Sequence, residues 1–234
     1  MNTQMKSSHR HEGNFPVAAI ASAGLAAVTL AVARKASAVT PALTFADIPG
    51  TGDVKVLNYA LALEDLESDL YAQAYQRLTN GGVNRLGTQI PGLGLDRSQL
   101  DVQLTGNFGQ VEADHRNLLR KTLGHKAIKT FKYNFGMESL DRKGVLDLLY
   151  TAESTGVGAY LGAIPFLATT KYLQIAGSIQ GTEARHTAVF AELINMLFAE
   201  NLEVAPTPSE NNGRDMPLDP NVVLARVSPF IVVG

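Results

Sequence analysis

The chain has 234 residues, of which 45% are hydrophobic, and it contains no cysteine and no tryptophan. This length and composition allow one domain with its own core and an additional segment. Its 20 basic and 22 acidic residues give a net charge of −2, so the charge balance does not indicate a nucleic-acid partner. Without cysteine, disulfides, thiol catalysis and cysteine-ligated zinc or iron–sulfur sites are excluded.

Residues 1–38 have the pattern of an export signal. Lys6 and Arg10 precede an apolar run over residues 15–33. Residues 36–38 (ASA) then match the small-x-small pattern that signal peptidases cut. The alternative is an uncleaved N-terminal anchor, because the run approaches the roughly 20 residues that span a bilayer. Both interpretations predict a periplasmic, cell-envelope or extracellular protein, with a membrane contact only if the segment is retained.

The first helix is predicted from Val54 to Leu78, after an extended lead-in over residues 39–52 and with Asp53 as its N-cap. Its apolar stripe repeats every three or four residues and carries one acidic residue, Glu64. Glu67 lies beside the stripe and is the alternative to Glu64 as a metal ligand.

Residues 79–106 form a glycine-rich connection, which fits a lid, a contact surface or tolerated surface. Its Gly-x-Gly at residues 92–94 has neither the preceding strand nor the full glycine pattern of a phosphate loop. Residues 97–104 have some helical character, and the second bundle helix is predicted from Asn107 to Leu123. Its inward stripe contains Glu112-x-x-His115.

Residues 125–142 have no helical stripe and are predicted to be extended. About 18 extended residues reach about 60 Å, whereas a bundle helix of about 18 residues is only about 27 Å long. This connection can therefore cross the full length of a bundle and make the second and third helices parallel.

The third helix is predicted from Lys143 to Ala168, with Glu153 on its stripe and Pro165 ending or kinking its last turns. A fourth helix is predicted to begin after residue 169 or 170 and to end near residue 200.

The stripe of the fourth helix contains Glu183-x-x-His186. Residues 201–234 hold five prolines, which exclude a further bundle helix. The apolar end of the chain (PFIVVG) is β-like and fits packing on the bundle or on a partner.

Six polar residues with metal-ligand chemistry fall on the inward stripes, in the order Glu, Glu-x-x-His, Glu, Glu-x-x-His. These residues are Glu64, Glu112, His115, Glu153, Glu183 and His186. A buried carboxylate is costly unless it is paired or bound to metal. Four carboxylates balance the charge of two divalent ions, and each histidine adds one neutral nitrogen. The set matches the pattern of di-iron and di-manganese bundles, and its oxygen and imidazole ligands suit iron or manganese better than structural zinc. The alternative is a buried hydrogen-bonded network without metal.

A tyrosine follows each single glutamate after seven residues, Tyr71 after Glu64 and Tyr160 after Glu153. This repeat predicts two helix pairs related by a pseudo-twofold axis. The tyrosines are candidates for hydrogen bonds to the ligand carboxylates or for oxidisable residues; the alternative is that they are ordinary core tyrosines.

Residues 53–200 resemble the ferritin-like domain of the desiccation-related protein family, which occurs in bacteria, plants and fungi, often with an export signal. The segments that carry the resemblance are LNYALALEDLESDLYAQA, VEADHRNLLRKTLG, FKYNF, and AESTGVGAYLG through SIQGTEARHTAVF. The resemblance implies an all-α, up-down-down-up four-helix bundle. It also implies metal-ligand roles for the six residues named above.

The expected function is that of a dinuclear, di-iron carboxylate protein that oxidises Fe²⁺ or reduces dioxygen or peroxide in protection against stress or desiccation. One alternative is peroxide disproportionation by two manganese ions, as in manganese catalases. A second is a structural protein of the cell envelope, with the bundle as scaffold. Residues 79–106 and 201–234 are the candidate contacts for a homodimer or for an envelope partner.

Overall fold

The computed structural model describes residues 43–206 and 212–232, so the predicted signal or anchor over residues 1–38 lies outside it. Within these ranges the chain is mainly helical, and the predicted all-α four-helix architecture is confirmed. The long helices are α1 (Asp53–Leu78), α2 (Leu100–Leu123), α3 (Arg142–Ala163) and α4 (Thr170–Phe198). None of the described helices combines the length and the apolar character needed to cross a bilayer.

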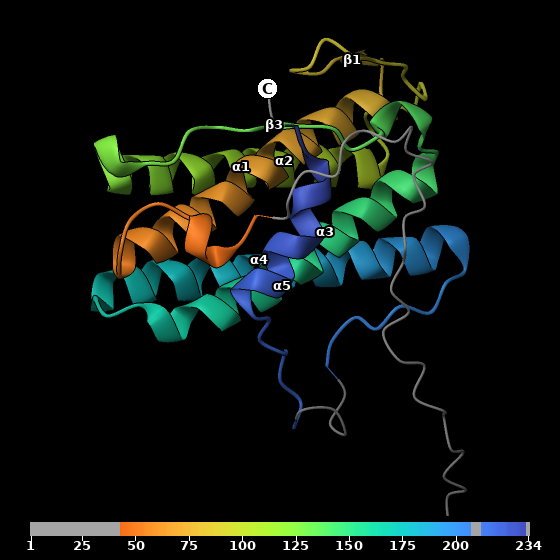
Figure 1. Cartoon of the computed structure of the whole chain (residues 1–234). Helices are drawn as coiled ribbons and strands as arrows, with labels where there is room; N and C mark the ends of the chain where they lie inside the picture. The colour runs from red at the N-terminus through yellow and green to blue at the C-terminus, as the bar shows by residue number, and fades with distance from the viewer. Residues whose placement is uncertain (1–42, 207–211, 233–234) are drawn as a thin grey trace, which may run out of the picture. The chain divides into compact units, whose positions relative to one another are not determined.

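The connection between α2 and α3 is the predicted long crossover. In Figure 1 it runs along the helices from the end of α2 to the beginning of α3, so these two helices point in the same direction. It contains two 3-10 turns, Gly124–Lys126 and Met137–Ser139, and between them the short strand β3 (Lys132–Tyr133). The helix order is therefore up-down-down-up, and α1 pairs closely with α2 and α3 with α4.

Two helix boundaries differ from the prediction. Helix α2 begins at Leu100 rather than at residue 107, because its first turns are anchored by the buried Val102 and by Asp101, which binds the Arg142 guanidinium at 2.7 and 2.9 Å. Helix α3 ends at Ala163 rather than at residue 168. A 3-10 turn containing Pro165 follows, since proline cannot donate the hydrogen bond that would extend the helix.

The prediction that Asp53 is the N-cap of α1 is wrong, because Gly52 occupies that position. The Asp53 carboxylate instead accepts hydrogen bonds from the backbone N–H groups of Ala168 (2.7 Å) and Thr169 (3.2 Å). Thr169 is the N-cap of α4, so Asp53 joins the beginning of α1 to the beginning of α4.

Helix α1 is buried on almost all sides between Val56 and Tyr71, not only along its predicted stripe. The crossover covers its outer face and pairs with polar residues there. Asn58 accepts a hydrogen bond from the Ile128 N–H at 2.8 Å, and Asp65 accepts one from the Thr130 hydroxyl at 3.4 Å. The polar face of α1 is thus a docking surface for the crossover.

The glycine-rich connection folds back onto the end of α1. It forms a hairpin of β1 (Gly82–Val83) and β2 (Gln89–Ile90), and the Leu93 N–H then bonds to the Arg77 carbonyl at 2.7 Å. A methyl group on Gly92 would lie 2.2 Å from the Thr79 carbonyl oxygen. Gly92 therefore permits close packing of two chain segments, whereas Gly94 adopts a positive φ of 70°.

The end of the chain packs on the bundle. The Leu218 N–H bonds to the Gly158 carbonyl of α3 at 2.9 Å, and the short helix α5 (Pro220–Val227) follows, in contact with α3. Strand β4 (Ile231–Val232) then pairs antiparallel with β3. The β-like end was predicted; the eight-residue helix α5, with Pro220 in its first turn, was not.

Gly162→Ala is expected to loosen this terminal segment. A methyl group at Gly162 would lie 1.8 Å from the Leu218 backbone oxygen, so the segment must move, at a cost of about 1–3 kcal/mol in the free energy of unfolding. Gly177→Ala is the control, because no heavy atom lies within 4 Å of the added methyl group. The control should gain about 0.5–1 kcal/mol from helix propensity alone. Urea unfolding measures the free energy of unfolding of both variants. Equal stabilities would contradict the close approach of Gly162 and Leu218.

Candidate metal centre

The six predicted residues meet in the middle of the bundle, between two apolar clusters. Along α1, Leu63 belongs to one cluster and Leu66 to the other, with Glu64 between them. Along α4, Ile179 belongs to the first cluster and Phe190 to the second, and Glu183 and His186 lie between them. The apolar layers exclude water above and below the polar residues, so these residues must satisfy one another or bind a ligand.

The first half of the site surrounds His115. Its Nδ1 atom lies 3.0 Å from Glu112 Oε2, 3.4 Å from Glu64 Oε2 and 3.5 Å from Glu183 Oε1. One nitrogen therefore faces three carboxylates, yet it carries at most one hydrogen to donate. A cation between these four atoms would satisfy all of them, and one ligand atom from each residue lies within 4.8 Å of the others.

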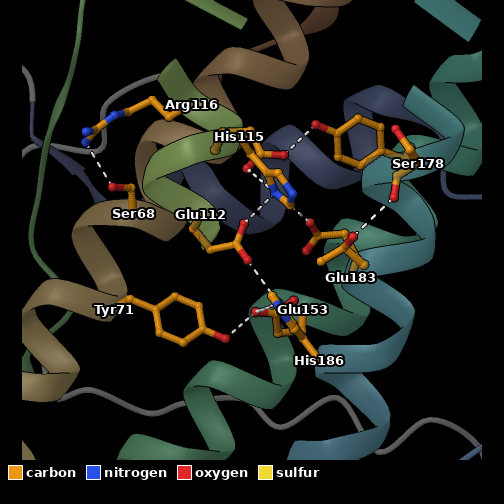
Figure 2. Close-up of polar contacts among 12 residues, drawn as sticks. Ser68, Tyr71, Glu112, His115, Arg116, Glu153, Ser178, Glu183 and His186 are labelled. Atoms are coloured by element: carbon orange, nitrogen blue, oxygen red, sulfur yellow. Dashed lines mark hydrogen bonds and ion pairs between the residues drawn. The ribbon is translucent and has the colours of Figure 1, made fainter. Parts of the chain in front are cut away.

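The second half of the site surrounds His186. Its Nδ1 atom lies 2.9 Å from Glu112 Oε1 and 3.2 Å from Glu153 Oε1. Glu112, Glu153, Glu183 and His186 form a second group of ligand atoms within 4.8 Å of one another. Glu112 and Glu183 belong to both groups, and Figure 2 shows Glu112 between the two histidines. The geometry thus divides the carboxylates into two that are shared and two that are terminal.

Several buried oxygens of the cluster have no hydrogen-bond partner. They are Glu64 Oε2, Glu153 Oε2 and both carboxylate oxygens of Glu183. A buried oxygen without a partner costs about 1–3 kcal/mol, and more when it is charged. Oxygen and imidazole donors are what iron and manganese accept. The residues present therefore fit two divalent cations in chemistry, number and charge.

The crowding of acids shifts the pKa values of the metal-free cluster. Burial, with Glu183 and Glu112 adding to it, raises the pKa of Glu64 to about 8 although His115 lowers it. Burial and repulsion between carboxylates raise the pKa values of Glu153 and Glu183. Burial alone would raise the pKa of Glu112, but its bonds to the two histidines lower it to about 2. Burial lowers the pKa of His115, yet the surrounding carboxylates bring it to about 12. Without a cation the cluster therefore retains protons that a metal would displace.

The two tyrosines bind the terminal carboxylates crosswise. The Tyr71 hydroxyl of α1 donates to Glu153 Oε1 of α3, as Figure 2 shows, and the Tyr160 hydroxyl of α3 donates to Glu64 Oε1 of α1. Burial and the nearby carboxylates raise the pKa values of both phenols, so they remain donors. The spacing of seven residues thus reflects an exchange of hydrogen bonds between α1 and α3, which fixes the orientation of both terminal carboxylates.

The two halves of the site differ in how far their histidines are exposed to solvent. The Phe108 ring stacks on the His186 ring with 3.9 Å between centroids, and the His186 side chain is 5% exposed. The His115 side chain is 13% exposed. The half of the site around His115 is therefore the more accessible to small molecules.

Other candidate residues lie outside the cluster. Arg116 donates to the Ser68 hydroxyl at 2.9 Å, and Arg185 bonds to Thr182 on the surface. His125 is exposed, and the histidines at positions 9 and 11 lie outside the described residues. Glu67, which the sequence placed beside the stripe, is buried next to the cluster but belongs to neither group. Its sequence signal was its position one helical turn after Glu64.

Comparisons with known proteins support this architecture. A family model described as a ferritin-like domain matches residues 52–196, which include all four long helices almost completely and all six cluster residues. No curated protein matches the chain.

Proposed function

The chain belongs to the ferritin-like domain family, and from this membership we propose that its cluster binds two iron ions and oxidises Fe²⁺ with dioxygen or peroxide. The observation that carries the proposal is the pair of histidine nitrogens joined by two shared carboxylates. Glu112 and Glu183 take part in both ligand groups, so two ions would be held side by side rather than in separate sites.

The charges of the cluster fit this chemistry. Four carboxylates supply four negative charges, which two Fe²⁺ ions neutralise. Bound iron would supply the redox chemistry, since each ion can lose one electron. Two electrons and two protons convert one peroxide to two waters, or one dioxygen to one peroxide.

The protein's own residues bind, orient and exclude water. The terminal carboxylates are held by Tyr71 and Tyr160, which keep one oxygen of each in a fixed place. The apolar clusters on both sides keep bulk water away from the cluster. A dry site with preoriented ligands favours the metal-bound state and restricts access to small oxidants.

A role in protection against oxidative stress or drying follows from the same proposal. Consuming Fe²⁺ together with peroxide removes the two reactants that generate radicals. The resemblance to desiccation-related proteins supports such a role, and the pattern of residues 1–38 supports an exported protein; both remain proposals.

The test is metal loading followed by oxidation. We expect the purified protein to bind two Fe²⁺ per chain without oxygen, and to consume one peroxide per two Fe²⁺ once peroxide is added. The variant Glu183→Ala with His186→Ala should do neither. A folded wild-type protein that stays metal-free in excess Fe²⁺ and Mn²⁺ would overturn the proposal and favour the scaffold. Peroxide disproportionation only with Mn²⁺ would replace iron oxidation by catalase chemistry.

A further inference from the structure

Helix α1 carries a second buried acid beside the cluster. Glu67 lies one helical turn after Glu64 and is 4% exposed. Among the described residues, no hydrogen bond or ion pair engages its carboxylate. Since a buried carboxylate without a partner is strongly disfavoured, its position requires an explanation.

Gly156 of α3 provides the space that Glu67 occupies. A methyl group on Gly156 would lie 3.2 Å from Glu67 Oε1 and 3.1 Å from Glu183 Oε2. Both oxygens thus border the same small space in the middle of the bundle. A methyl group at position 156 would press on both oxygens, so the carboxylates of Glu67 and of Glu183, one of the two shared carboxylates, would have to shift.

The internal repeat shows that this arrangement is asymmetric. Glu64 corresponds to Glu153, and Tyr71 to Tyr160, in the two helix pairs. By the same offset Glu67 corresponds to Gly156, three residues after each terminal glutamate. One helix therefore provides an extra carboxylate where the other provides only room for it.

We propose that Glu67 is a further protein ligand of the dinuclear centre and reaches it through the space at Gly156. This inference rests on the proposed function. With Glu67 the centre has five carboxylates, so it offers one negative charge more than two divalent ions neutralise. The two metal positions are then unequal in ligands, in addition to their unequal exposure.

Co²⁺ is the probe, because it binds similar donors, does not react readily with oxygen in such sites, and has visible absorption that depends on its coordination. We expect the wild type to bind two Co²⁺ per chain. Glu67→Gln should weaken one of the two by about tenfold or more and change the absorption spectrum. Gly156→Ala should act in the same direction, because its methyl group presses on the carboxylates of Glu67 and Glu183. Glu192→Gln, on the exposed side of α4, is the control and should bind like the wild type.

Melting of the metal-free proteins separates a binding effect from misfolding. Glu67→Gln replaces a crowded buried acid with an amide of the same shape, so its metal-free form should melt at or above the wild-type temperature. A folded Glu67→Gln protein with wild-type Co²⁺ affinities and spectrum overturns this inference alone. A wild type that binds no Co²⁺, Fe²⁺ or Mn²⁺ overturns the proposed function instead.

Discussion

Glu183→Gln is expected to remove metal binding from both positions, whereas Glu153→Gln is expected to spare one. Glu183 belongs to both ligand groups, but Glu153 belongs only to the group around His186. Losing a shared carboxylate removes one ligand from each ion and one negative charge from between them. We expect affinity at both positions to fall by about 100-fold, at the upper end of the range for disturbed metal sites.

Calorimetric titration and elemental analysis measure this difference. The wild type should retain two ions per chain, Glu153→Gln about one, and Glu183→Gln close to none at metal concentrations that saturate the wild type. The glutamine side chain preserves shape, so the metal-free variants should melt near the wild-type temperature. Equal stoichiometry in the two variants would contradict the assignment of Glu183 as shared and Glu153 as terminal.

The metal-free protein is expected to lose stability as the pH rises from about 5 to about 8, and metal is expected to reverse this trend. The folded-state pKa of Glu64 is about 8 against an ordinary 4.5, so between these values the folded chain binds more protons than the unfolded chain. Stability then falls with rising pH. His115 acts in the same direction: its pKa rises from 6.5 to about 12, so its contribution is complete below pH 6.5 and is lost progressively as the pH rises from 6.5 to about 12.

Glu112 is expected to lower the stability of the metal-free protein at acidic pH. Its pKa of about 2 lies below the ordinary 4.5, so its contribution is present above pH 4.5 and is lost on further acidification. The metal-free protein should therefore be most stable near pH 4.5 to 5. Metal must displace the protons of the cluster, so its affinity should increase with pH over the range in which the metal-free protein weakens.

Melting curves with and without Mn²⁺ across this pH range test the prediction. At 100 times the dissociation constant, each bound ion adds about 2.7 kcal/mol, or about 5–10 °C for a domain of this size. The difference in melting temperature between loaded and metal-free protein should grow from about pH 5 to about pH 8. Proton release on metal binding, measured by titration in buffers of different ionisation enthalpy, should accompany it. A difference that is independent of pH would contradict protonation of the empty cluster.

Helix periodicity alone determined the four long helices and the six cluster residues. Each of Glu64, Glu112, Glu153 and Glu183 sits at a spacing of three or four residues within an apolar stripe, which only an inward-facing position explains. The length of the crossover likewise determined the parallel direction of α2 and α3, because an extended chain spans more than a helix of equal residue count.

Tertiary contacts determined features of the fold that the apolar stripes of the helices do not predict. The sequence predicts Asp53 as the N-cap of its own helix, but its carboxylate binds the beginning of α4, which is 115 residues away in sequence. Helix α1 has a polar outer face, yet this face is buried because the crossover covers it. A periodic pattern reports which side of a helix is apolar; it contains no information on what later segments cover the polar side.

Glu67 shows the same division at the site itself. Its angular position on α1 placed it beside the stripe, and only the missing side chain at Gly156 on another helix leaves room for it next to Glu183. The sequence by itself determined the fold and the six cluster residues, because both follow from local spacing. The division into shared and terminal carboxylates, the crosswise tyrosine bonds and the place of Glu67 were decided by tertiary structure, because each depends on a distance between two helices.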